Sequence, residues 1–113
     1  MKPLLTALLL LPTVTLAETY GNTAGCNRVN GQPEGSDSVA IFRPGENLEF
    51  WESTCPITGF TMVGAGATVV TVQCSGEGDT WEAYYMLETT EDDGFTLYPE
   101  DNPDARTALA RCD

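Results

Sequence analysis

Carboxylates dominate the side chains of this sequence that could take part in chemistry. The 113 residues include 17 aspartates and glutamates, and Glu77, Asp79 and Glu82 stand together in one short stretch. The usual catalytic serine and cysteine sites need a histidine or lysine as base, yet the sequence has no histidine and its single lysine is Lys2. Two carboxylates across a cleft can hydrolyse glycosides, but no pattern in so short a chain indicates a cleft. We therefore expect no enzymatic activity and no catalytic residue.

The second set of reactive side chains consists of four cysteines, Cys26, Cys55, Cys74 and Cys112. In a short secreted chain an even number of cysteines predicts disulfides, here two. A zinc site is the alternative, but these cysteines are widely spaced, whereas zinc ligands usually come in close pairs. The acidic runs of the chain carry oxygen ligands that calcium accepts, without the spacing of an EF-hand loop. We expect neither a metal site nor a cofactor.

Residues 1–17 have the features of a secretory signal peptide. Lys2 is followed by an apolar run, and small residues precede a predicted cleavage site before Glu18. The apolar run is too short to span a membrane as a helix. We therefore expect a secreted or periplasmic protein without membrane insertion. Residues 23–26 are also similar to the end of a lipoprotein signal, but a lipid on Cys26 would leave an odd number of cysteines.

The charge of the mature chain limits its partners. Residues 18–113 keep 17 carboxylates against four arginines, a net charge of −13. Nucleic acids and anionic lipid surfaces are bound through lysine and arginine, so neither is an expected partner. A basic protein would be attracted to such a surface. The alternative is that the charge serves only solubility in a saline environment.

Residues 67–88 give the strongest structural pattern. Apolar and polar side chains alternate before and after a turn of glycine and acidic residues at 75–79, which is typical of two strands with one buried face each. Shorter patterns of the same kind predict strands at 38–43, 47–54 and 58–63 and one after Gly94. Pro44-Gly45 between the first two of these fits a type II turn.

Six short strands with regular turns predict an all-β fold, either a small antiparallel barrel or a sandwich. Residues 18–37 are rich in glycine and asparagine and predict an irregular N-terminal arm, which leaves 38–113 as the β-domain. A capping pattern makes residues 101–112 a predicted short C-terminal helix, with a strand over 107–112 as the alternative. The expected core consists of Val39, Ile41, Leu48, Phe50, Phe60, Val70, Val72, Trp81, Tyr85, Leu87, Phe95 and Leu97.

The predicted hairpin between 58–63 and 67–74 allows the cysteines to be paired. If the chain turns at Ala65-Gly66, Cys55 lies close to position 76, and a slip of one residue or a bulge brings it beside Cys74. Bonded cysteines need Cα atoms within about 7 Å of each other. We therefore predict a Cys55–Cys74 bond between neighbouring strands and, by elimination, a Cys26–Cys112 bond that joins the ends of the domain.

Five side chains are candidate binding residues: Glu77, Asp79, Glu82, Tyr84 and Trp51. The three carboxylates form an acidic turn that could contact a basic partner. Tyr84 points outward if its neighbour Tyr85 is in the core, and with Met86 it could form an apolar patch for a second subunit. Trp51 or Trp81 could line a pocket for a carbohydrate or another small ligand.

The outline of the chain resembles the small periplasmic β-barrels of bacteria that inhibit lysozymes, with a signal peptide, about one hundred mature residues, disulfides and many strands. Ser75-Gly76 is similar to the Ser-Gly that opens the inhibitory loop in one such family, whereas Glu77-Gly78-Asp79 stands where a tyrosine is expected. The resemblance implies a non-catalytic protein that binds a basic enzyme through its acidic turn.

Two other functions remain open from the sequence. One is a structural or envelope-associated protein that acts as a homo-oligomer, and the other is a binder of carbohydrates or small ligands. The chain is expected to be a monomer or a homodimer.

Overall fold

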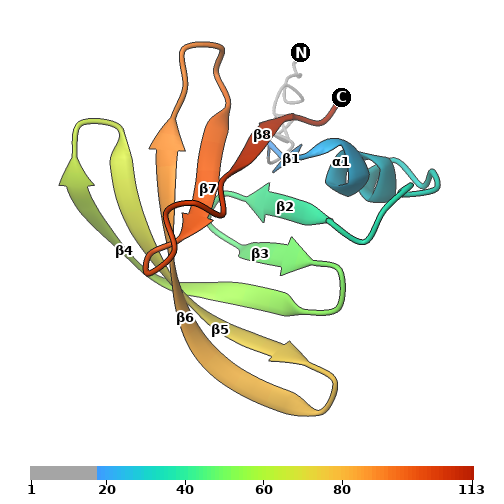
Figure 1. The fold of residues 1–113 in the computed structure, drawn as a ribbon, viewed down its shortest axis with the longest axis horizontal. Coiled ribbons are helices and arrows are strands. Elements are labelled where there is room, and N and C mark those ends of the chain that lie inside the picture. The colour runs from blue at the N-terminus through green and yellow to red at the C-terminus, as the bar shows by residue number, and fades with distance from the viewer. Residues whose placement is uncertain (1–17) are drawn as a thin grey trace, which may run out of the picture.

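Residues 18–113 fold into a closed barrel of eight antiparallel strands with one short helix against its side (Figure 1). This is the part of the chain that the structure, a computed structural model, describes; the predicted signal peptide lies outside the described residues. Neighbouring strands in the sequence pair with each other, and the first strand also pairs with the last, which closes the barrel. The elements are β1 (Tyr20–Gly21), α1 (Thr23–Val29), β2 (Ala40–Arg43), β3 (Asn47–Phe50), β4 (Thr54–Gly64), β5 (Ala67–Gly76), β6 (Asp79–Thr89), β7 (Phe95–Pro99) and β8 (Thr107–Arg111).

The predicted all-β fold with two disulfides is confirmed, but β1 is absent from the prediction and β8 appears in it only as an alternative. The predicted C-terminal helix is wrong, and the alternative strand is present as β8. This strand pairs with β7 on one side, where Thr107 lies opposite Leu97, and with β1 on the other, where Ala110 lies opposite Gly21. A short isolated helix is marginal, whereas β8 satisfies two strand edges that would otherwise be unpaired.

The N-terminal segment is ordered by a strand and a helix, so the predicted irregular arm over 18–37 is wrong for its first half. The Asn22 side chain caps α1 by accepting a hydrogen bond from the Gly25 N–H at 2.8 Å. Gly25 packs directly on β2, where a Cβ atom would overlap the Ala40 carbonyl oxygen. Cys26 is bonded to Cys112, so its thiol is not available for the lipid considered above.

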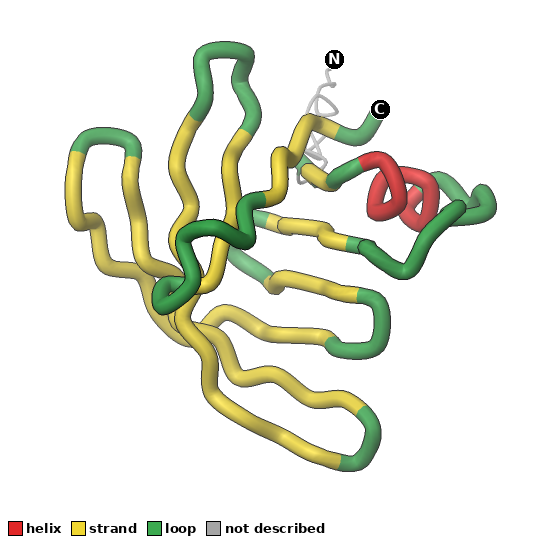
Figure 2. The backbone as a smooth tube through the Cα atoms, in the orientation of Figure 1, coloured by secondary structure: helices red, strands yellow, loops and turns green. Residues whose placement is uncertain are grey.

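Two tight turns depend on backbone with positive φ, and Figure 2 shows both between neighbouring strands. Pro44-Gly45 forms the predicted type II turn between β2 and β3, with φ of 78° at Gly45. Glu77-Gly78 joins β5 to β6 with φ of 51° and 85°, the pattern of a type I′ hairpin turn. Glu77 is therefore held at the tip of a long, tightly turned hairpin.

Both predicted disulfides are present. The Cα atoms of Cys55 and Cys74 are 3.9 Å apart, and the bond joins β4 to β5. Near the turn Gly64 lies opposite Ala67, but at the far end Thr54 lies opposite Ser75. Two irregularities in the pairing, rather than the single slip that we predicted, move Cys55 from the level of position 76 to that of Cys74.

The barrel interior holds a continuous apolar core. Its buried members are Tyr20, Ala40, Phe42, Leu48, Cys55, Val70, Val72, Cys74, Leu87, Leu97 and Leu109. The predicted core residues Phe60 and Trp81 are instead 54% and 41% exposed. Both lie opposite buried residues of β5, but the two hairpins that carry them extend past the closed part of the barrel (Figure 1). Val39 and Ile41 are buried in a second cluster, outside the barrel, against Ala24 of α1.

The two disulfides indicate an oxidising environment outside the cytoplasm. Within residues 18–113 the structure contains no helix with the length and apolar character needed to cross a membrane.

Candidate functional site

An open groove lies between two turns of the barrel. One wall is the turn between β3 and β4, and the other is the end of the β5–β6 hairpin. The groove has a volume of about 560 Å³ and opens to solvent. We call it the acidic groove and define it by six of the side chains that line it: Asp37, Trp51, Glu52, Glu77, Asp79 and Trp81.

The Cys55–Cys74 bond brings these two turns together. Glu52 stands three residues before Cys55 and Glu77 three residues after Cys74, so the register of the bond places the two carboxylates side by side. Gly76 permits the close approach, because a Cβ atom there would overlap the Glu52 carbonyl oxygen. Because glycine has no side chain, the two walls of the groove can lie close together at position 76.

Arg28 of α1 holds the turn between β3 and β4 in place. Its guanidinium donates hydrogen bonds to the carbonyl oxygens of Phe50 and Trp51, each at 3.2 Å. The guanidinium carbon also lies 5.7 Å from the centre of the Trp51 ring, within the range of a cation–π interaction. The helix and its disulfide to Cys112 thus position one wall of the acidic groove.

Glu49 connects this arrangement to the barrel through two ion pairs. Its carboxylate lies 2.9 Å from Arg28 and 2.8 Å from Arg43. Burial raises the pKa of Glu49, but the hydrogen bonds and charges of Arg43 and Arg28 outweigh it and lower the pKa below its ordinary value. Because the pKa is lowered in the folded state, the ionised carboxylate stabilises the fold above the unfolded-state pKa. That stability is lost as the pH falls through the folded-state pKa.

We expect Glu49→Gln to lower the free energy of unfolding by about 1–2 kcal/mol at pH 7, because it removes two partly buried charged hydrogen bonds. The difference from the native protein should shrink as the pH falls through the lowered folded-state pKa of Glu49, because Glu49 then becomes protonated in the native protein as well. Urea unfolding at pH 7 and pH 3 measures both values. Glu91→Gln, at an exposed loop position, is the control, and a loss that does not depend on pH would contradict the role of the charge.

The carboxylates of the acidic groove have no basic partner within residues 18–113. The arginines of this part of the chain form ion pairs with Glu18, Glu34, Glu49 and Glu88, none of which lines the groove. Like charges that converge on one concave surface create a strong negative potential. The acidic groove is therefore a surface that would attract a cation.

Glu52 and Glu77 show this lack of a counter-charge most clearly. A hydrogen bond with Glu77 and the repulsion of its negative charge raise the pKa of Glu52 above its ordinary value. Two carboxyl groups this close favour a proton, or another cation, between them. The groove carries its full negative charge only at pH values above the raised pKa of Glu52.

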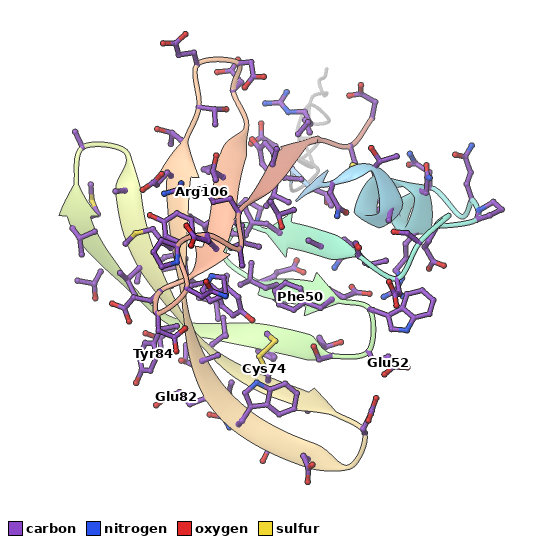
Figure 3. All side chains as sticks on the ribbon, in the orientation of Figure 1. Phe50, Glu52, Cys74, Glu82, Tyr84 and Arg106 are labelled. Carbon is purple, nitrogen blue, oxygen red and sulfur yellow. A yellow bond between two sulfur atoms is a disulfide. The ribbon has the colours of Figure 1, made fainter. Side chains whose placement is uncertain are left out.

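Three of the five candidate binding residues, Trp51, Glu77 and Asp79, line the acidic groove. Glu82 and Tyr84 lie apart from it, at a second hollow of about 330 Å³. Figure 3 shows these two side chains together on the side of the barrel away from Glu52. The Tyr84 hydroxyl donates a hydrogen bond to the Glu82 carboxylate at 2.8 Å, and this bond raises the pKa of Tyr84. The predicted acidic turn is thus divided between two surfaces.

Sequence reasoning missed Glu52 and Asp37 as members of the site. A signal for Glu52 was present in the predicted Cys55–Cys74 bond. That bond places the residue three before Cys55 next to the residue three after Cys74, which is Glu77. Asp37 precedes β2 in a segment without periodicity, and no pattern locates it. Trp81 was named as a ligand contact but was also expected in the core; it contributes to the groove because the β5–β6 hairpin extends beyond the barrel.

The contact groups of the groove are carboxylate oxygens and indole rings. In the described part of the chain, no three cysteine or acidic side chains are grouped so that they could hold a metal ion.

No protein-family model, curated protein or solved structure matches this chain.

Proposed function

We propose that this is a non-catalytic binding protein, exported from the cytoplasm, that recognises a basic protein through the acidic groove. The observation that carries the proposal is the lining of the groove. Four carboxylates and two half-exposed tryptophans meet there, and none of the carboxylates has an ion-pair partner among residues 18–113. Such a surface is complementary to a lysine or arginine side chain.

Both kinds of groove residue favour a cation. A guanidinium can donate two hydrogen bonds to one carboxylate, and such charge-assisted bonds are stronger than neutral ones. The indole of tryptophan is the best aromatic partner for a cation. Trp51 and Trp81 have 42% and 41% of their surface exposed in the free protein, which leaves both rings accessible to a ligand.

The proposal includes export by the signal peptide at residues 1–17, to the periplasm or the cell exterior. The two disulfides support a location outside the cytoplasm. The proposal assigns no catalytic step to the protein: residues 18–113 contain neither histidine nor lysine and their cysteines are all bonded, so the common serine and cysteine nucleophile sites have no base there. The net charge of −13 would steer a basic partner toward the protein and speed its association.

A lysozyme is the most concrete partner. The barrel with two disulfides agrees in outline with the lysozyme-inhibiting proteins that the sequence resembles. Where a tyrosine is expected after the Ser-Gly pair, this chain has Glu77 at the tip of the hairpin. We therefore assign the contact to charge and to Trp81, rather than to a single inserted aromatic side chain.

We expect the protein to slow the hydrolysis of bacterial cell walls by lysozyme at low salt, and less so as salt rises. Trp81→Ala should weaken lysozyme binding about tenfold or more, as truncation of a central aromatic contact usually does. Glu52→Gln and Asp79→Asn should each weaken it roughly two- to fivefold, the range of an exposed ion pair. Calorimetric titration with lysozyme measures these affinities.

Glu91→Gln and Asp104→Asn are the matched controls, because each removes one charge outside the acidic groove. Both should leave the affinity for lysozyme nearly unchanged. Equal losses from the groove variants and the controls would show that the attraction is general and not due to the groove. N-acetylarginine amide, which carries the side chain of arginine, serves as a small probe of the acidic groove. The proposal is contradicted if lysozymes keep their full activity and if this probe does not change the fluorescence of the tryptophans.

A carbohydrate or another small uncharged ligand is the second candidate, since Trp51 and Trp81 line the same groove. The volume of about 560 Å³ is within the range of small-molecule sites. Binding of such a ligand would depend little on salt and would survive Glu52→Gln. Tryptophan fluorescence across a panel of oligosaccharides separates the two functions.

A further inference from the structure

The second half of β4 is an open edge of the sheet. β3 pairs with β4 only between Thr54 and Pro56, and the Ile57 N–H donates one more bond to the Glu46 carbonyl oxygen. From Thr58 to Gly64, β4 pairs with β5 alone. In Figure 1 no strand lies along the outer side of this part of β4, whereas β5 on its inner side continues the sheet to β6. One row of backbone N–H and C=O groups of Thr58–Gly64 therefore faces outward.

This open edge has neither charge nor proline to hinder pairing with another chain. Natural edge strands are guarded by charged residues, by proline, by β-bulges or by very short length. The pairing of β4 with β5 is irregular between Ile57 and Gly59 and between Met62 and Gly64, so Gly59–Met62 is the stretch with regular register. Thr58–Gly64 contains no charge and no proline, although the described chain carries a net charge of −13. Phe60, Met62 and Val63 are 54%, 76% and 54% exposed along it.

A second open edge in the same molecule gives the contrast. β6 pairs with β7 only from Tyr85 onward, and the Glu100 N–H donates a hydrogen bond to the Tyr84 carbonyl oxygen, which leaves the stretch from Asp79 to Ala83 bound to β5 alone. That stretch carries Asp79 and Glu82, two charges that guard it. The edge of β4 is thus the one of the two without charge, which leaves it more open to pairing with another strand.

We propose that two copies of the protein associate by antiparallel pairing of their β4 edges over Thr58–Gly64, through a two-fold axis at Thr61. In this register Phe60 of each copy lies opposite Met62 of the other copy, and both of these pairs lie on the same face of the joined sheet. Aromatic and thioether side chains attract each other in such contacts. The pairs nearest the axis, at Thr61 and between Phe60 and Met62, fall within Gly59–Met62, the stretch of β4 with regular register.

Charge identifies the second copy as the occupant. A basic partner is drawn to carboxylates, and Thr58–Gly64 offers none. Two copies of a strongly acidic protein repel each other over most of their surface, so an uncharged edge is where they can meet. The dimer also leaves the acidic groove free, because its six defining residues lie outside β4.

Sedimentation equilibrium at increasing salt tests the dimer. We expect a monomer–dimer equilibrium that shifts toward the dimer as salt screens the repulsion between copies. This is the opposite of the salt effect expected for binding of a basic partner, so the two proposals can fail independently. A protein that remains a monomer at high salt and high concentration overturns the dimer proposal.

Two lysine variants locate the interface. Met62→Lys should abolish the dimer without affecting the fold, since the side chain is 76% exposed. Tyr84→Lys makes the same charge change on the outer face of β6, at a side chain that is 45% exposed, and should leave the dimer intact. Both variants reduce the net negative charge, so a loss of association cannot come from added repulsion. A dimer lost in Tyr84→Lys and kept in Met62→Lys would overturn the assignment to β4.

Cysteine crosslinking tests the register. In the proposed dimer Thr61 lies opposite itself, so Thr61→Cys should form a disulfide between copies. Thr58 lies opposite Gly64 and is about 20 Å along the strand from its own copy, so Thr58→Cys should not. Peptide mapping confirms that the native Cys55–Cys74 and Cys26–Cys112 bonds are retained. Crosslinking of Thr58→Cys but not of Thr61→Cys would contradict the register.

Discussion

Replacing Cys55 and Cys74 together by alanine should lower the free energy of unfolding by about 3–5 kcal/mol. The two residues are 19 apart in the sequence, and the loss of that loop constraint on the unfolded chain accounts for about 3 kcal/mol. Their side chains are 0% and 1% exposed, so removal of the sulfur atoms also leaves a gap in the barrel core. A domain of this size has little stability to spare.

Urea unfolding followed by circular dichroism measures this loss, and the Cys26→Ala/Cys112→Ala variant is the comparison. That bond spans 86 residues, and the same chain-entropy relation gives about 4.6 kcal/mol for it. Both variants should therefore be strongly destabilised. Loss of the Cys55–Cys74 bond should separate the two walls of the acidic groove directly, whereas loss of the Cys26–Cys112 bond should act on one wall through α1 and Arg28. An unchanged urea midpoint in the Cys55→Ala/Cys74→Ala variant would refute the stabilising role.

Leu48→Ala should destabilise the protein by about 2–5 kcal/mol, the range for a fully buried leucine. Leu48 is 0% exposed and lies opposite both Phe42 of β2 and Cys55 of β4. Truncation opens a cavity where three strands meet, and the disulfide at Cys55 limits how far the core can collapse into it.

Met62→Ala is the matched control for this core variant. It also replaces a long apolar side chain, but one that is 76% exposed, and should change the unfolding free energy by less than about 0.5 kcal/mol in the monomer. Urea unfolding of both variants at low protein concentration gives the two values. If Leu48→Ala costs no more than Met62→Ala, the assignment of Leu48 to the centre of the core is incorrect.

Most of the strand positions between Ala40 and Pro99 could be predicted because their side chains alternate, and this local pattern survives in the folded barrel. The predicted strand over 47–54 is wrong in its second half, because β3 ends at Phe50 and β4 begins at Thr54 after a turn. β1 could not, because a strand of two residues has no period, and it exists only through its pairing with β2 and β8. α1 was missed because seven residues are too few for a stable isolated helix. The Asn22 cap, the packing of Gly25 on β2 and the Cys26–Cys112 bond stabilise it instead.

The candidate site was predictable to the extent that it follows from one hairpin. Glu77 and Asp79 belong to a turn that the sequence marks clearly. Glu82 is close to them in sequence but lies on another face, because neighbouring positions of a strand point to opposite sides. The partners of Glu77 across the groove, Trp51 and Glu52, come from a different turn, and only the register of a disulfide brings them near.

The pairing of β1 with β8 has a consequence for how the chain acquires its fold. Tyr20 pairs with Arg111, so the first and last strands must both be available before the barrel can close. A contact between such distant residues slows folding, because a long loop must be ordered before the contact repays it. A ribosome-bound chain cannot make this contact until its last strand has emerged. The barrel can therefore close only after synthesis of the last strand is complete.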